Sequence, residues 1–171
     1  GLIERHERAL KVMEREGAIV EPIAPPFDAT AVWHAWLVWR RVLVAPRVAV
    51  LLDKPGARDA MNPEALWEHD QAESLSALDF LAASEARSRL HQQMRELVDR
   101  FDVVALPATQ CWPFPVEWRW PKTIAGRTMD TYHRWMECTL YATFAGLPSF
   151  RSVRLNVPRS GLTTRVTMKY P

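Results

Sequence analysis

Two cysteines and a histidine are the side chains in this sequence that most readily suggest chemistry. Cys111 follows a short apolar run, and His133 and Cys138 come later in the chain. A cysteine becomes a nucleophile when a neighbouring histidine or another cation lowers the pKa of its thiol, so Cys111 and His133 form one candidate pair. His133 and Cys138 would give a metal only two ligands, fewer than zinc takes in proteins. Packed, unreactive thiols are the simpler interpretation, and the sequence predicts no metal and no cofactor.

Hydroxyl and carboxyl groups gather in the middle of the chain. Ser74 and Ser76 precede a long stretch with helical apolar periodicity. Ser76 stands three residues before Asp79, which is the spacing of a capping box with Asp in the place of Glu. We therefore expect these serines to cap a helix rather than to attack a substrate. Four acidic residues stand just upstream in a Pro- and Gly-containing segment, where a solvated face is the ordinary explanation: Asp59, Glu64, Glu68 and Asp70.

The composition fits one folded domain with no obvious macromolecular partner. The chain has 171 residues, of which 48% are apolar and 25% charged, so a single unit over residues 1–171 is expected. A net charge of +2 gives no case for a nucleic-acid surface. No apolar run is long enough to span a bilayer, and the charged N-terminus does not resemble a signal peptide. With only two cysteines and no tandem spacing, a reduced, cytoplasmic setting is expected.

Apolar periodicity and capping residues predict four helices. They are residues 1–16, ended by Gly17; a helix capped by Asp28 that stops near Pro46; residues 76–100; and a helix capped by Asp130 that ends at Gly146. Short apolar or alternating runs predict strands at residues 18–23 and 103–106 and near residues 150–153 and 163–168. Residues 53–72 are expected to be irregular. This order predicts an α/β fold class, with part of a mixed β-sheet flanked by α-helices.

Tryptophan is concentrated in two places. Trp33, Trp36 and Trp39 recur at steps of three and form a slanted stripe along the second predicted helix. We expect this stripe to pack on the sheet; the alternative is a substrate or partner surface. The segment from Cys111 to Pro121 interleaves aromatic residues with prolines, which favours an extended backbone. Its tryptophans either line a substrate pocket or pin a long loop to the body of the protein.

Several segments, in this order, resemble the amidase-signature family. Residues 101–109, Phe-Asp-Val-Val-Ala-Leu-Pro-Ala-Thr, are similar to a strand that in the family usually reads F-D-V-L-L-T-P-T. Residues 145–148 resemble its A/T-G-x-P turn, and residues 161–171 resemble its last motif. The upstream order fits as well: residues 17–21, then residues 26–28, a Trp-rich helix and a long capped helix. The chain departs from the family at Thr163 and Arg165, where the last motif has Pro and Gly, and at residues 152–156.

The resemblance implies an amidase that is incomplete in this chain. The family hydrolyses carboxamides through an acyl-enzyme, with a Ser–cis-Ser–Lys triad whose serines lie in a Gly/Ser-rich segment. The motif order places residues 1–171 downstream of that segment, and none of the six glycines is adjacent to another. No triad residue is therefore assigned to this chain. For the loop after residues 101–109, the resemblance implies an acyl pocket with Thr109, Cys111 and Trp112 in its wall.

The expected function is that of a C-terminal amidase fragment, truncated or trimmed, that contributes sheet strands and a pocket wall and is inactive alone. Its expected partners are a small-molecule amide in the complete enzyme and either the missing N-terminal half or a second copy of the chain. Neither nucleic acid nor a membrane is expected. The alternatives are a non-catalytic binding or interaction module of amidase ancestry and a self-sufficient enzyme that uses Cys111.

Overall fold

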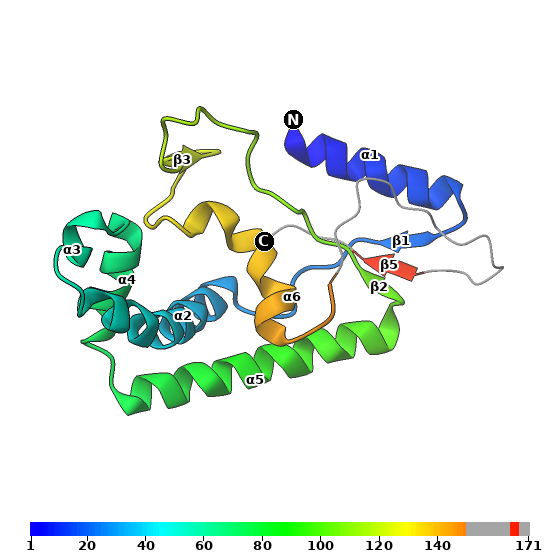
Figure 1. Cartoon of the computed structure of the whole chain (residues 1–171). Helices are drawn as coiled ribbons and strands as arrows, with labels where there is room; N and C mark the ends of the chain where they lie inside the picture. The colour runs from blue at the N-terminus through cyan, green and yellow to red at the C-terminus, as the bar shows by residue number, and fades with distance from the viewer. Residues whose placement is uncertain (150–164, 168–171) are drawn as a thin grey trace. The chain divides into compact units, whose positions relative to one another are not determined.

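The fold is known from a computed structural model, which describes residues 1–149 and 165–167 (Figure 1). The chain packs as two compact units, one from Gly1–Phe27 and His91–Pro171 and the other from Asp28–Leu90. The expectation of a single domain over residues 1–171 stays a prediction. The strand expected near residues 150–153 lies outside the described residues.

The predicted α/β fold class, with a mixed sheet flanked by helices, is wrong. Helices account for 59% of the structure and strands for only 6%. A small parallel sheet joins three strands in the order β1-β5-β2: β1 is Ile19–Glu21, β2 is Val103–Val104 and β5 is Arg165–Thr167. The apolar run at residues 103–106 predicted a longer strand. Among the residues that the structure describes, only Val103 and Val104 of this run pair with a neighbouring strand. The length of a strand depends on neighbours that one segment of sequence cannot reveal.

Helix α1, Leu2–Arg15, packs against this small sheet. Met13 of α1 and Ala18 are buried together, and four partly buried side chains pack against them: Leu10, Val20, Val103 and Ala105. Gly17 has a φ of 99°, in the left-handed region that a residue with a Cβ rarely adopts, and it ends the helix as predicted. The helix expected at residues 1–16 therefore agrees with the structure.

After β2, a long segment leads to a β-hairpin. Its strands are β3, Thr123–Ile124, and β4, Arg127–Thr128, which pair antiparallel. Ala125 and Gly126 connect them with φ angles of 49° and 82°. Two consecutive positive φ angles are what a two-residue hairpin turn needs to match the twist of the strands.

The hairpin is followed by two short helices that run into each other. The 3-10 helix η1, Arg134–Thr139, continues directly into α6, Leu140–Ala145. Gly146 ends α6 with a φ of 75°, as the sequence predicted. Asp130, which was expected to cap this helix, does not: η1 begins after His133.

The second unit is helical, including the stretch expected to be irregular. Helix α2, Ala29–Leu52, begins at Asp28, whose carboxylate accepts hydrogen bonds from the backbone as predicted. It does not stop at Pro46 but continues for six more residues, and Pro46 is exposed. Two helices lie within residues 53–72: α3, Ala57–Ala60, and α4, Pro63–Ala72. The prolines were interpreted as breakers, whereas Pro63 takes the first helical position, where its missing N–H costs nothing.

The tryptophan stripe of α2 packs among helices, which corrects the expectation that it packs on the sheet. Trp33 and Trp36 stack with ring centroids 5.2 Å apart. Trp39 lies 4.8 Å from the ring of Phe80, which belongs to α5, Ala77–Arg100. Arg87, also on α5, has its guanidinium 4.9 Å from the centroid of the Trp39 ring. Tryptophan at this spacing gave no information about which kind of element would cover it.

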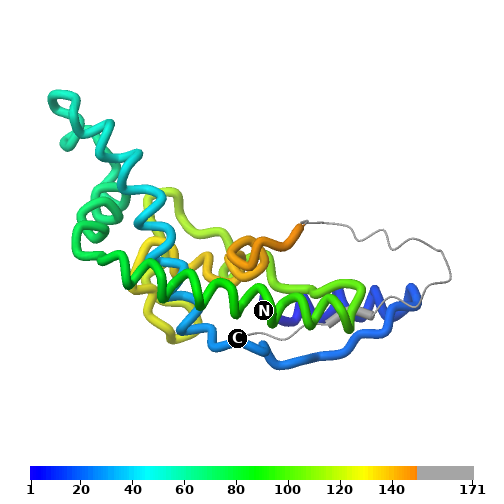
Figure 2. Tube along the Cα trace, turned by 90° about the horizontal axis from the view of Figure 1, so that it is seen from below, coloured from blue at the N-terminus to red at the C-terminus, as the bar shows by residue number. Residues whose placement is uncertain are grey.

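Helix α5 runs without interruption over the predicted length (Figure 2). Its start has the predicted capping box: the Ser76 hydroxyl accepts from the Asp79 N–H at 3.1 Å, and Asp79 Oδ2 accepts from the Ser76 N–H at 2.8 Å. Leu90, Met94 and Leu97 of the predicted apolar stripe are buried. The first turns differ from the prediction, because Leu78 is 75% exposed and Ala82 is exposed as well.

Replacing Ser76 with alanine should lower the free energy of unfolding by about 1 kcal/mol. The change removes the oxygen that accepts from the Asp79 N–H, together with the 2.7 Å hydrogen bond that the Ser76 hydroxyl donates to Asp79 Oδ2. Chemical denaturation measures this as a shift of the midpoint. Ser88→Ala is the control on the same helix, because that hydroxyl only bonds back to the Ser84 carbonyl, an interaction that does not stabilise helices. Equal midpoints for the Ser76→Ala variant and the wild type would contradict the prediction.

Candidate functional site

The loop after β2 holds the three residues predicted to line a substrate pocket. The Thr109 hydroxyl donates to the Cys111 carbonyl at 3.0 Å and accepts from the Cys111 N–H at 3.4 Å. These two hydrogen bonds close a tight side-chain turn, and both residues are partly buried. Trp112 is 49% exposed, and the Arg5 guanidinium of α1 lies 5.0 Å from its ring centroid. The structure therefore joins Thr109 and Cys111, whereas Trp112 contacts a different element.

Gln110, between these residues, anchors the loop and was missed in the sequence. Its side-chain Oε1 accepts a hydrogen bond from the Cys138 N–H at 2.9 Å. Cys138 lies in η1, 28 residues further along the chain. The contact fixes the segment after β2 against η1. A lone glutamine after an apolar run carries no signal in the sequence that would predict a partner at that separation.

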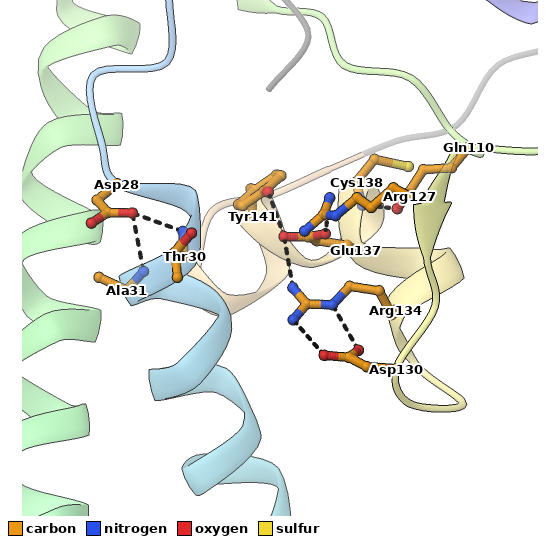
Figure 3. A network of polar contacts seen from close by, with 10 residues as sticks. All are labelled: Asp28, Thr30, Ala31, Gln110, Arg127, Asp130, Arg134, Glu137, Cys138 and Tyr141. Carbon is orange, nitrogen blue, oxygen red and sulfur yellow. Dashed lines mark hydrogen bonds and ion pairs between the residues drawn. The ribbon is translucent and has the colours of Figure 1, made fainter. Parts of the chain in front are cut away.

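A buried carboxylate stands at the centre of η1. The Glu137 side chain is only 5% exposed, and Figure 3 shows its contacts with two arginines and a tyrosine, one as an ion pair and two as hydrogen bonds. Arg127 Nη1, from the β3–β4 hairpin, lies 2.9 Å from Oε2. Arg134 Nη1 and the Tyr141 hydroxyl each lie 3.4 Å from Oε1. The carboxylate thus ties the hairpin, η1 and α6 together.

The second carboxylate of this network is Asp130. Arg134 Nε and Nη2 each lie 3.0 Å from one of its oxygens, which is the two-pronged geometry that guanidinium groups favour. These hydrogen bonds are the main cause that holds the pKa of Asp130 below its usual range. The carboxylate that was expected to cap a helix is occupied instead by an arginine four residues later.

Both thiols have pKa values above the usual range for cysteine. Burial raises the pKa of Cys138 to about 11 and also raises the pKa of Cys111, against a lowering contribution from the Thr109 hydroxyl. His133 is buried, with its ring edge-on to Tyr132 at 5.1 Å between centroids. A nucleophilic cysteine needs a lowered thiol pKa, so this environment opposes the role considered for Cys111. Among the described residues, no group of three His, Cys, Asp or Glu side chains could hold a metal ion.

The four acidic residues of the middle segment do not share one solvated face. Glu68 is buried, with 4% of its side chain exposed, and it pairs with Arg40 of α2. Asp70 is exposed and accepts a hydrogen bond from Arg58 at 2.7 Å. The interpretation as a solvated face is therefore wrong for Glu68, whose carboxylate links α4 to α2.

The aromatic residues of the loop from Cys111 to Pro121 divide between two environments. Phe114 packs edge-on against Trp135 at 5.3 Å, and Trp120 packs edge-on against Tyr132 at 6.0 Å. Trp118 points to the surface with 54% of its area exposed. Phe114 and Trp120 thus hold the loop against the rest of the protein, whereas Trp118 stays accessible to solvent.

Comparisons of the chain with protein-family models, with curated proteins and with solved structures found no match. The resemblance to the amidase-signature family therefore depends on the motifs and their order alone. None of the helices in the described part of the chain is long and apolar enough to cross a membrane.

Proposed function

We propose that this chain is the C-terminal part of an amidase-signature hydrolase, which contributes a wall of the substrate pocket and no catalytic group. The observation that carries the proposal is the fixed loop after β2. Thr109 and Cys111 form a closed turn there, and Gln110 binds the backbone of η1. This loop follows the segment that most resembles the family, directly after the two-residue parallel strand β2.

The ionisation of the cysteines near this loop supports a role in lining the substrate pocket rather than in catalysis. Burial raises the pKa values of the Cys111 and Cys138 thiols, which disfavours the thiolate form that a nucleophilic cysteine needs. Ser76 is engaged in capping α5. In the complete enzyme, a base from the upstream segment would take the proton of a serine, whose oxygen would attack the carboxamide carbon and release ammonia or an amine. Water would then hydrolyse the resulting acyl-enzyme to the carboxylic acid. The proposed substrate is a small amide, and the proposed setting is the cytoplasm.

A non-catalytic binding module of amidase ancestry is the second candidate. One specific observation favours it: Trp112 and Trp118 are about half exposed on the same loop. Large aromatic side chains that remain accessible are typical of contact surfaces. Both candidates share the absence of a catalytic group in this chain and differ in whether an upstream catalytic segment exists.

The purified chain is expected to release no ammonia or amine from aliphatic and aromatic amides. The same preparation should not react with a serine-directed fluorophosphonate probe. The matched control is the Cys111→Ala variant, which removes the more accessible thiol. Turnover that persists in this variant would identify a catalyst outside the account, and turnover lost in it would identify a thiol enzyme. Either result would contradict the proposal.

A further inference from the structure

The two cysteines of the chain are brought into one place by a residue that stands next to the first of them. Gln110 precedes Cys111, and its side-chain Oε1 accepts the hydrogen bond from the Cys138 N–H at 2.9 Å (Figure 3). Consecutive Cα atoms are only about 3.8 Å apart, so Cys111 is one residue away from the side chain that touches Cys138. Both cysteines are free thiols. The fold therefore brings together two oxidisable groups that the sequence keeps far apart.

Each thiol is carried by a stretch of backbone that is fixed by hydrogen bonds. The Thr109 hydroxyl bonds to both the N–H and the carbonyl of Cys111, and it also forms a hydrogen bond with the Cys111 thiol. Cys138 lies in η1, and only 6% of it is exposed. Little conformational freedom has to be lost at either end when the two side chains are joined.

The ionisation of the two thiols is coupled. Burial is the largest cause that raises the pKa of Cys138 to about 11, and the charges of Glu137 and Cys111 raise it further. A charge shifts a pKa strongly only at short range, so this coupling agrees with the contact made by Gln110. A disulfide carries no charge and no polar hydrogen, and so it suits a buried position in which a thiolate is disfavoured.

We propose that Cys111 and Cys138 form a redox modification site, which a small-molecule disulfide such as oxidised glutathione closes into a disulfide bond within the chain. The thiolate of Cys111, the more exposed of the two, attacks one sulfur of the oxidant, and a glutathione thiolate leaves. The thiolate of Cys138 then attacks the Cys111 sulfur and displaces the second glutathione thiolate. The two cysteines lose two electrons and two protons, and one oxidised glutathione becomes two reduced molecules.

The raised pKa values slow this reaction without opposing its product. Cysteine pairs with stabilised thiolates favour the reduced form and make strongly oxidising disulfides. Burial disfavours the thiolates of Cys111 and Cys138, so this source of stability for the reduced form is missing here. The closed bond would tie the loop after β2 covalently to η1, where Gln110 now ties it by a hydrogen bond. The site does not depend on the proposed amidase ancestry.

The test compares disulfide formation in the folded chain and in the unfolded chain. The full chain is equilibrated with mixtures of reduced and oxidised glutathione, once in buffer and once in concentrated urea, and its free thiols are then trapped by alkylation. Mass spectrometry measures the closed form, which lacks two hydrogen atoms and takes up no alkyl group. The equilibrium constant for closure should be at least about tenfold larger in the folded chain, because the fold raises the effective concentration of one thiol at the other.

Two variants control the result. Cys111→Ser should form no closed species and at most a mixed disulfide of Cys138 with glutathione. Gln110→Ala keeps both thiols but loses the contact with η1, so its folded chain should close several-fold less favourably than the wild type. Closure in the wild type should also become faster as the pH rises, since the thiolate is the attacking form.

A folded chain that closes no more readily than the unfolded chain would overturn the proposal, because the fold would then not bring the thiols together. Disulfides that form only between two chains, seen as dimers on a non-reducing gel, would overturn it as well. By linkage, the closed chain should resist urea better than the reduced chain, by the same factor that separates the two closure constants.

Discussion

Replacing Glu137 with alanine is expected to lower the free energy of unfolding by about 3 kcal/mol. Removing one partner of a buried ion pair costs about 3–5 kcal/mol, because the remaining charge stays out of water. Here the Arg134 guanidinium, with 10% of its side chain exposed, keeps Asp130 but loses its second carboxylate. The lower end of the range therefore applies. Chemical denaturation with hydrogen exchange would measure the loss and locate it in η1 and the hairpin.

Two milder variants of the same network separate charge from packing. Glu137→Gln keeps the shape and one acceptor oxygen, so its loss of stability should be smaller than that of Glu137→Ala. Tyr141→Phe removes one 3.4 Å hydrogen bond to Glu137 and should cost only about 1 kcal/mol. If Glu137→Ala cost no more than Tyr141→Phe, the carboxylate would not be the centre of the network.

Replacing Arg40 with methionine should destabilise the second unit by about 3 kcal/mol. The Glu68 carboxylate, with 4% of its side chain exposed, would lose its ion pair with the Arg40 guanidinium. Charge attraction between Glu68 and the neighbouring Arg41, which acts to raise the pKa of Arg41 against the larger lowering by burial, would offset part of the loss. The Arg40 guanidinium also lies 5.6 Å from the Trp36 ring, a contact that methionine would not reproduce. Denaturation midpoints and hydrogen exchange of α2 and α4 would measure the effect.

A second substitution, at Glu68, should restore stability to the Arg40→Met variant. In the double variant Arg40→Met/Glu68→Leu, both charges are gone, so most of the lost stability should return. The matched control is Arg58→Met, which breaks an exposed pair with Asp70 and should cost at most about 1 kcal/mol. A double variant as unstable as Arg40→Met would show that packing rather than charge decides the site.

Local chemistry explains the elements that were predicted correctly. Asp28 and Ser76 begin helices because their side-chain oxygens satisfy N–H groups that no helical carbonyl can reach. Gly17 and Gly146 end helices because they adopt the left-handed backbone. Each of these signals lies within a few residues of the boundary that it sets.

The parts that were not predicted depend on partners far along the chain. The hydrogen bond from Cys138 to Gln110 spans 28 residues, and so does the ion pair of Arg40 with Glu68. The sheet failed as a prediction for the same reason, because an apolar run does not say how many of its residues will find a neighbouring strand. The Asp130 carboxylate could either cap a helix or pair with a cation four residues later. It pairs with Arg134, so it does not cap the helix.

The candidate site was predicted only in part. Thr109 and Cys111 do lie together, because a hydroxyl two residues before a backbone N–H readily closes a turn. Trp112 lies against Arg5 of α1, an arrangement that the sequence order alone does not suggest. Whether these residues line an amide pocket stays a prediction.

The central proposal is that this chain is the C-terminal part of an amidase-signature hydrolase whose catalytic segment is encoded upstream of Gly1. The most direct measurement is the sequence of the reading frame ahead of the Gly1 codon. The account predicts a Gly/Ser-rich segment with closely spaced serines and a lysine earlier in the same frame, as the amide-hydrolysing triad requires. A frame that opens at Gly1, or that continues upstream into a sequence without that segment, would contradict it.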